Sequence, residues 1–377
     1  MSEKRFVYID HIRIILTGIV ILHHLLITYG APGGWYYREF ELTQLDLPTL
    51  TLLVLVTVGN QAYFMGFFFF LSGYFSVNAL LKKGQVTYLL QRILRLGLPL
   101  LFYVYLISPL LRLSLRSILY HQDFSLENMR TIYTQLRFGL ELGPMWFLLL
   151  LLIFSFLLLP WTTLTNKFSI QPHTISGRQI LLIALITGLL TFFIRIPFPI
   201  GYVYQPLNLQ IPYLLQYSIL YFLGVLAYKG KWLDKIPEIQ FRSWLILALG
   251  MAGLMPILFF LSGGTQGDVG PALGGFHWQS LALSVWEQIF CTSVILILLF
   301  VFRTKTDSPT KITNELAASA YTAFLIHPLI LVILTTSLHK ITLHPLIKIS
   351  TLAIPSLILC FLVAGFFRRL PGFKAVL

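Results

Sequence analysis

The sequence predicts an all-α integral membrane protein with ten transmembrane helices, both termini lying in the cytoplasm. Of the 377 residues, 57% are hydrophobic and only 11% are charged, whereas a soluble domain carries about 25% charged residues. The mean hydropathy of +0.81 agrees, because so few ionic side chains cannot cover a soluble surface. The apolar residues also fall in runs of about 20, the length that crosses the hydrocarbon core as a helix.

Ten apolar runs define the spans in chain order. They cover residues 12–30, 60–81, 96–115, 144–162, 179–196, 212–228, 243–262, 279–302, 316–336 and 349–367. A further run, 47–58, is too short to cross alone, so we expect it to extend the second span or to lie in the interface. Lys4 and Arg5 precede the first run as in a signal peptide, but no A-x-A-like cleavage site follows. We therefore interpret that run as a retained span.

The connections are short, without an internal repeat or a soluble domain, so residues 1–377 are expected to form a single membrane domain. Two segments are longer. Residues 118–142 have mixed charge and are predicted to contain a surface helix, and the glycine-rich 263–276 is interpreted as a mobile loop. Cys291 and Cys360 lie inside apolar runs, so neither a disulfide framework nor a metal site is expected.

The basic residues predict the orientation of the chain. With the N-terminus inside, 19 of the 27 Lys and Arg residues fall on the cytoplasmic side, as the positive-inside rule requires. An odd number of spans would break this alternation of loops. The net charge of +13 is therefore explained by topology, and a nucleic-acid partner is not expected.

Three ionisable side chains lie at membrane depth, where such groups are costly and face a cavity or a partner. They are His24, Glu287 and His327. A helical rise of 1.5 Å per residue places His24 and His327 about 16 and 18 Å from the cytoplasmic side, and Glu287 about 13 Å from the outer side. All three are thus predicted near the midplane, as a shared buried site requires.

The first span places a cation and an imidazole on one helix face. Arg13 and His24 are eleven residues apart, close to three helical turns. Asp10 lies three residues before Arg13 and is expected to pair with it. His23 is rotated by about 100° from His24, so we expect it to point away from the cavity that His24 faces.

Together these segments resemble the acyltransferase-3 family of integral membrane acyltransferases. The resemblance covers nearly the whole chain. It rests on YIDHIRIILTGIVILHH (Arg13, His24), FFFFLSGYFSVNALLKKG (Ser72, Tyr74), Arg92-x-x-Arg95 with Pro99, GPMWFLLLLL (Trp146) and SAYTAFLIHPL (His327). HWQSLALSVWEQIF around Glu287 and IRIPFPIG around Arg195 resemble the subgroup that contains the periplasmic glucan succinyltransferase. One departure is Met145, where many members have a histidine, and it concerns a contact on the acceptor side.

The resemblance implies transfer of an acyl group, acetyl or succinyl, from cytoplasmic acyl-coenzyme A to a hydroxyl of a carbohydrate-type acceptor across the membrane. Coenzyme A is then a donor substrate, with no permanently bound cofactor and no metal. Its phosphates would bind Arg13, Arg92 and Arg95, and its arm, roughly 15–20 Å long, would reach the depth of His24.

The expected site residues fall into three groups. The catalytic group is His24, Glu287 and His327; the coenzyme A group is Arg13, Arg92 and Arg95; the acceptor or site-lining group is Ser72, Tyr74, Trp146 and Arg195. His24 would act as general base or accept the acyl group itself. Glu287 would orient or stabilise its imidazolium, and His327 would polarise the carbonyl or contact the acceptor.

Two other function classes stay open at this point. Buried His and Glu at the midplane also suit a transporter or exporter of a polysaccharide or small solute, and a membrane scaffold needs no chemistry at all. The cytoplasmic arginines aligned with a deep histidine favour the acyltransferase, because a carrier has no use for them. The expected location is the bacterial plasma (inner) membrane.

Overall fold

The computed structural model describes residues 6–136, 142–167, 175–205, 207–235, 239–305 and 309–370. These residues contain no β-strand, only one isolated bridge. The α-helices are α1 (Val7–Thr28), α2 (Leu47–Lys83), α3 (Gln85–Arg92), α4 (Leu98–Phe102), α5 (Ser108–Tyr120), α6 (Leu126–Leu136), α7 (Trp146–Lys167), α8 (Gly177–Arg195), α9 (Ile211–Lys229), α10 (Ile239–Leu261), α11 (Gly270–Leu273), α12 (Trp278–Lys305), α13 (Lys311–Ser337) and α14 (Pro345–Arg369).

Within this described part, ten helices are long and apolar enough to cross a membrane, which confirms the predicted number. The run at 47–58 extends the second span, because α2 is continuous from Leu47 to Lys83. Its first turn is capped by Asp46, which accepts a hydrogen bond from the Thr49 backbone N–H at 2.9 Å. The bonds from Thr49 hold the pKa of the Asp46 carboxyl down at about 2. The predicted surface helix in 118–142 is α6.

The third span is irregular, and its two prolines explain why. Two π-helical turns, Ile93–Gly97 and Tyr103–Ile107, interrupt it. Pro99 and Pro109 have no N–H to bond the carbonyl four residues earlier. Tyrosine hydroxyls replace these donors, because Tyr321 bonds the Arg95 carbonyl at 2.6 Å and Tyr133 of α6 bonds the Tyr105 carbonyl. The widened turns are thus fixed by contacts with other elements.

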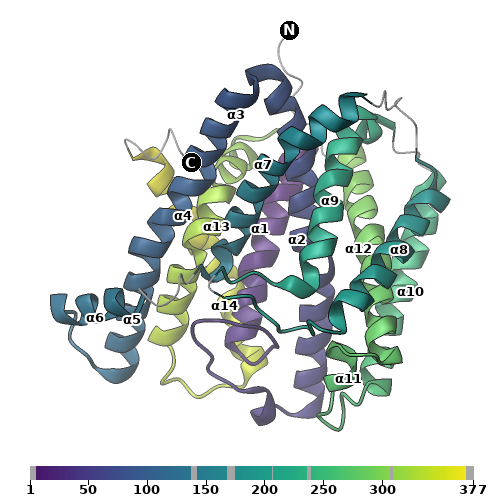
Figure 1. Cartoon of the computed structure of the whole chain (residues 1–377). Helices are drawn as coiled ribbons and strands as arrows, with labels where there is room; N and C mark the ends of the chain where they lie inside the picture. Colours follow the sequence, from purple (N-terminus) through teal and green to yellow (C-terminus); the bar gives the residue numbers. More distant parts are fainter. Residues whose placement is uncertain are drawn as a thin grey trace.

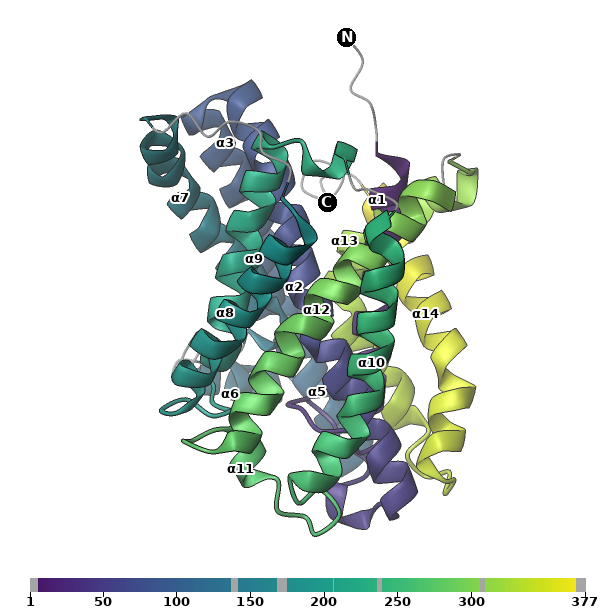
Figure 2. The same ribbon diagram turned by 90° about the vertical axis from the view of Figure 1, so that its right-hand side faces the viewer.

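The long helices run side by side, as Figures 1 and 2 show, and α1 lies in the middle of the view in Figure 1. The beginning of α1 lies near the end of α12, where His11 stacks on Phe302 at 6.4 Å. The end of α14 lies beside the beginning of α13, where Arg368 pairs with Glu315 at 2.6 Å. We call this the terminal end of the bundle, and the opposite one, which carries the loop 29–46, the cavity end.

The glycine-rich segment 263–276 is tied to the chain that follows α8. Gly275 donates to the Arg195 carbonyl at 3.1 Å, and Ile200 donates to the Leu273 carbonyl at 2.7 Å. The segment also contains the short helix α11. The structure therefore does not support its interpretation as a mobile loop.

Two glycines allow α2 and α9 to pack backbone against backbone. A Cβ atom at Gly73 would lie 2.0 Å from the Tyr221 carbonyl oxygen, and one at Gly224 would lie 2.0 Å from the Phe70 oxygen. These are backbone atoms, so a larger residue forces the helices apart. Small residues permit such close approach in membrane helices generally.

We expect Gly73→Ala to destabilise the protein, because the crossing would have to open. Overpacking of this kind costs about 1–3 kcal/mol or more. Gly250→Ala in α10 is the matched control, since nothing lies within 4 Å of its added Cβ, and alanine favours the helix. Thermal unfolding in detergent measures both variants. Equal midpoints would contradict a tight crossing at Gly73.

Which end faces the cytoplasm stays a prediction from the basic loops. In intact cells, a membrane-impermeant maleimide should label Gly34→Cys at the cavity end and leave Lys83→Cys at the terminal end unlabelled. The native Cys291 and Cys360 are buried, so background labelling is low. The reverse pattern would invert the topology.

Candidate active site

A large cavity lies at the cavity end of the bundle and reaches down to the histidines of α1. Its volume is about 1460 Å³. Loop residues around Gly34, Gly201 and Gly267 form its rim, and His24 and Phe64 belong to its deeper lining. Such a volume exceeds the roughly 300–1,000 Å³ that is usual for small-molecule sites.

His24 and His327 form a hydrogen-bonded pair at the wall of this cavity. His24 Nδ1 lies 3.2 Å from His327 Nε2, so the convergence in depth predicted for these two residues is confirmed. The ring of His327 is fully buried and does not line the cavity. Its predicted action on a carbonyl or an acceptor therefore stays a prediction, and its contact in this structure is with His24.

The backbone around the pair determines where the protons lie. A carbonyl only accepts, so His327 Nδ1, 2.6 Å from the Phe324 oxygen, carries hydrogen and leaves Nε2 as an acceptor. His24 Nδ1 lies 2.9 Å from the Val20 oxygen and so also carries hydrogen, which it shares with His327. His24 Nε2 then has the lone pair. It has no hydrogen bond in the described part of the chain and is not a buried atom, so this lone pair is open to the cavity.

The loop between α1 and α2 folds back over His24. Trp35 stacks on the imidazole with ring centroids 4.1 Å apart. The loop is anchored by Glu39, whose N–H donates to the Thr28 carbonyl at 2.8 Å and whose carboxylate pairs with the buried Lys348. Trp35 therefore packs on one face of the His24 ring and restricts its orientation.

His23 also lines the cavity, contrary to the expectation that it points away. Its ring lies 4.9 Å from that of Phe64, and its buried Nδ1 has no partner among the described residues. The rotation of about 100° between the two rings holds, but the cavity is wide enough to touch both faces of α1. Only His24 is paired with His327.

Glu287 is paired with Arg195, and its predicted role in orienting or stabilising the His24 imidazolium stays a prediction. Arg195 Nη2 lies 2.6 Å from Glu287 Oε2, and Arg195 Nη1 donates to Ser284 Oγ at 3.2 Å. The two side chains are 0% and 5% exposed, and the guanidinium also lies over the Tyr213 ring. Glu287 lines the same cavity as His24. Its Oε1 is buried and has no partner in the described residues.

The three arginines of the predicted coenzyme A group lie outside this cavity. Arg13 pairs with Asp10 at 3.7 Å, as predicted, and lies over the Phe75 ring. Arg92 donates to Ser76 Oγ at 2.8 Å. Arg13 and Arg92 thus contact consecutive residues of α2, Phe75 and Ser76. Arg95 lies within the first π turn and is exposed.

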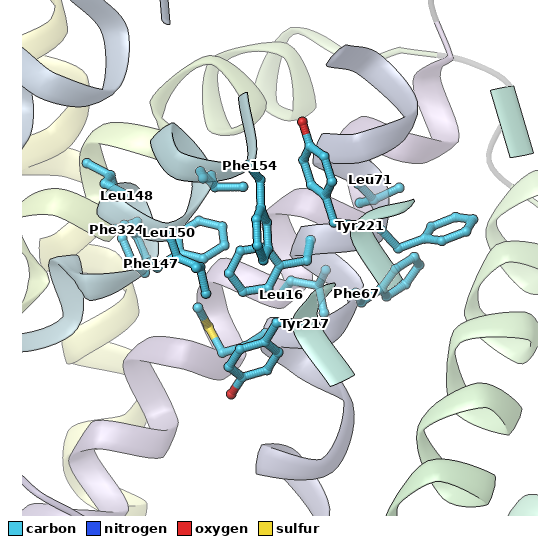
Figure 3. Close-up of a cluster of buried hydrophobic side chains, with 14 of the residues drawn as sticks. Leu16, Phe67, Leu71, Phe147, Leu148, Leu150, Phe154, Tyr217, Tyr221 and Phe324 are labelled. Atoms are coloured by element: carbon cyan, nitrogen blue, oxygen red, sulfur yellow. The ribbon is translucent and has the colours of Figure 1, made fainter. Parts of the chain in front are cut away.

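A layer of aromatic rings separates these arginines from the cavity. It consists of Phe69, Phe147, Phe154, Tyr217 and Tyr221, all buried. Ring centroids lie 4.9 Å apart for Phe69 and Tyr217 and 5.0 Å apart for Phe154 and Tyr221. Figure 3 shows four of these residues, with Leu16 beside them. Along α1 the order is Arg13, Leu16 and then His24, so the expected straight path for a donor arm is filled by side chains.

The remaining predicted site residues have different surroundings. Trp146 lines the cavity and stacks on Tyr217 at 5.4 Å, so it is part of the interior. Tyr74 packs between Phe6 and Tyr228 in the core. Neither Tyr74 nor Ser72 lines the cavity, so their assignment to the site stays a prediction without support from this cavity.

Several cavity residues were missed by the sequence reasoning. They are Trp35, Tyr36, Gln61, Arg112, Arg116 and Asn208. Arg112 and Arg116 lie one turn apart on α5. The spacing of this pair on one face could have suggested a ligand, whereas nothing local marks Trp35 or Asn208.

Comparison with known proteins gives one result. The family model described as an acyltransferase domain, Acyl_transf_3, matches residues 6–365. No curated protein and no solved structure gives a significant match. The matched range includes both histidines, the buried Arg195–Glu287 pair and the arginines of the terminal end.

Proposed function

The chain belongs to the acyltransferase-3 family, and on that premise we propose that it transfers an acetyl or succinyl group from acyl-coenzyme A to a hydroxyl of a carbohydrate acceptor. The observation that carries this proposal is the lone pair of His24 Nε2. It faces a cavity that can hold an acceptor, while Nδ1 is fixed by Val20 and His327.

His24 acts as general base in the simpler form of the reaction. Nε2 takes the proton of the acceptor hydroxyl as the hydroxyl oxygen bonds to the thioester carbonyl carbon. The carbon–sulfur bond then breaks, and the thiolate of coenzyme A takes the proton back from the imidazolium. His327 Nε2 accepts the hydrogen bond from His24 Nδ1 throughout and so stabilises the charged His24 ring. A carboxylate plays this role in the catalytic triad of hydrolases. In the two-step form, Nε2 attacks the thioester and carries the acyl group itself.

The cavity lining suits a sugar. Trp35 and Trp146 line the cavity with aromatic rings on which the C–H surface of a pyranose can pack, while Gln61 and Asn208 offer amide donors and acceptors. Glu287 Oε1 adds a carboxylate oxygen with unused capacity, held in place by Arg195. We assign Glu287 to hydrogen bonding of an acceptor hydroxyl.

The donor is proposed to bind at the terminal end. There Arg13 and Arg92 contact two adjacent residues of α2, the Phe75 ring and the Ser76 hydroxyl. Guanidinium groups bind phosphates through paired, charge-assisted hydrogen bonds. For the thioester to reach His24, side chains of the aromatic layer must rotate. Transfer therefore includes a conformational step that opens this layer.

We expect Arg92→Ala to weaken coenzyme A binding about ten- to a hundredfold, because it removes a contact worth about 1.5–3 kcal/mol. Arg95→Ala is the matched variant. Its exposed charge contributes at most about 1 kcal/mol, so a less than about fivefold effect is expected. Calorimetric titration of coenzyme A on purified variants measures both, with Ser76→Ala as a control for the lost Ser76 bond. Wild-type affinity in Arg92→Ala would remove Arg92 from the donor site.

The proposed activity is tested with purified protein, acetyl- or succinyl-coenzyme A and a β-linked glucose trisaccharide. We expect consumption of the thioester together with a sugar product heavier by the acyl mass, and neither in His24→Gln. Release of unmodified trisaccharide from vesicles, without loss of thioester, would instead indicate a transporter.

A further inference from the structure

Lys348 is a buried cation that the reaction described above does not use. It lies in the first turn of α14, and its side chain is only 3% exposed. A lysine near the end of a membrane helix ordinarily extends its ammonium group to water, whereas a buried one requires a partner. The Lys348 ammonium group pairs with the Glu39 carboxylate, donates to the Leu338 carbonyl at 3.3 Å and lies over the Tyr29 ring. Neither Lys348 nor Glu39 lines the cavity, so the pair is remote from a ligand bound there.

The carboxylate partner belongs to the base of a short segment that covers the histidine pair. We call residues 31–39 the strap. The Glu39 N–H donates to the Thr28 carbonyl at the end of α1, at 2.8 Å. The Arg38 guanidinium donates to the Ala31 carbonyl at 2.7 Å, which closes the strap on itself. A residue at the middle of the strap therefore takes its position from this base.

Trp35 is that middle residue, and it packs against both α1 and α14. Its ring stacks on His24 with centroids 4.1 Å apart and lies nearly parallel to the His327 ring at 5.9 Å. Trp35 also belongs to the same apolar cluster as Leu346 and Ile349, which are on either side of the buried lysine in the sequence. The beginning of α14 thus provides both apolar neighbours for the indole and the cation that fixes the base of the strap.

We propose that Lys348 is a positioning residue for acyl transfer, because through Glu39 it holds the strap so that Trp35 stays on His24. The inference rests on the proposed function, in which His24 Nε2 takes the proton of the acceptor hydroxyl. An imidazole held in one plane presents its lone pair in one direction, and a misplacement of about 1 Å can cost about a hundredfold in rate. Lys348 thereby contributes to turnover without contacting the donor or the acceptor.

A second contact keeps the loop in place when this pair is broken. His344 Nε2 lies 3.2 Å from Asp46 Oδ2, which joins the end of the same loop to the beginning of α14. Loss of Lys348 is therefore expected to displace the strap rather than to unfold the loop. Lys348→Met leaves the Glu39 carboxylate without its cation, which is costly in a buried pair. In Lys348→Met/Glu39→Gln no charge remains unpaired, so this charge-free variant keeps the test valid if Lys348→Met alone fails to fold.

The test is a double-mutant cycle between Lys348 and Trp35. We expect Lys348→Met and the charge-free variant to lower kcat about ten- to a hundredfold, with coenzyme A affinity unchanged. Trp35→Ala should cause a similar loss, and Lys348→Met/Trp35→Ala should be no slower than Trp35→Ala alone. Lys340→Met is the matched control, since Lys340 is exposed, and it should keep the wild-type kcat.

The fluorescence of Trp35 gives a readout that does not depend on activity. Its emission is the difference between the tryptophan spectrum of each protein and that of the same protein carrying Trp35→Phe. We expect a red shift of this emission in Lys348→Met and in the charge-free variant, because the displaced indole meets more water. No shift is expected in Lys340→Met.

Each outcome has a distinct meaning. Unchanged Trp35 emission in the charge-free variant would overturn the inference whatever its kcat, and so would a wild-type kcat. Losses that multiply in Lys348→Met/Trp35→Ala would also overturn it, because Lys348 would then act independently of Trp35. If the wild type transfers no acyl group, the proposed function fails. A red shift in Lys348→Met would even then support the positioning of Trp35 by Lys348, and unchanged emission would overturn it.

Discussion

His24→Gln is expected to abolish acyl transfer, by about 10²–10⁴-fold or more, since general-base catalysis contributes that much. Glutamine keeps a polar side chain of similar length and cannot take a proton. His23→Gln is the matched control at the neighbouring position of the same cavity, and it should retain most of the activity because His23 makes no contact with His327. The measurement is thioester consumption by purified variants that elute as folded protein.

The pair of results separates a catalytic role from a structural one. Loss of activity in His23→Gln with near-normal His24→Gln would exchange the two assignments. Comparable losses in both would mean that the cavity tolerates no change at this depth. Coenzyme A binding in His24→Gln should match that of the wild type, because the arginines of the terminal end are untouched.

The second large effect concerns stability. Arg195→Met leaves the Glu287 carboxylate buried without its cation, and breaking a buried pair from one side costs about 3–5 kcal/mol. We therefore expect a clear fall in the thermal midpoint of Arg195→Met. The double variant Arg195→Met/Glu287→Gln should recover part of that loss, since no unpaired charge remains.

Glu287→Gln alone tests the acceptor contact. The amide still offers an oxygen to a sugar hydroxyl but no longer attracts Arg195, so acceptor KM should rise while donor binding is unchanged. Additive losses in the double variant would show that Arg195 and Glu287 act independently, against the 2.6 Å contact in the structure.

The sequence predicted the spans and the depth of the histidines because both follow from fixed helical geometry. A constant rise per residue brought His24 and His327 to one level, and they are hydrogen bonded. The rise per residue did not predict that Glu287 pairs with Arg195. Arg195 ends its helix, where a charge is ordinarily assigned to the loop, and only the packing of α8 against α12 turns it inward.

Other misses have equally local causes. The spacing of Arg92 and Arg95 assumed a regular helix, but the π turn ahead of Pro99 separates their side chains. The rotation of about 100° between His23 and His24 is correct, but it does not exclude His23 from the cavity lining. The width of the cavity depends on several helices and cannot be predicted from one. Trp35 belongs to a loop that is held by the ion pair between Glu39 and the distant Lys348. A sequence pattern cannot predict such a long-range contact.

The aromatic layer has a consequence for the membrane as a whole. A protein that hands a chemical group from one compartment to the other risks becoming a leak for protons and ions. Here five buried rings pack against one another, so on the proposed function we expect this layer to limit the passage of ions between turnovers.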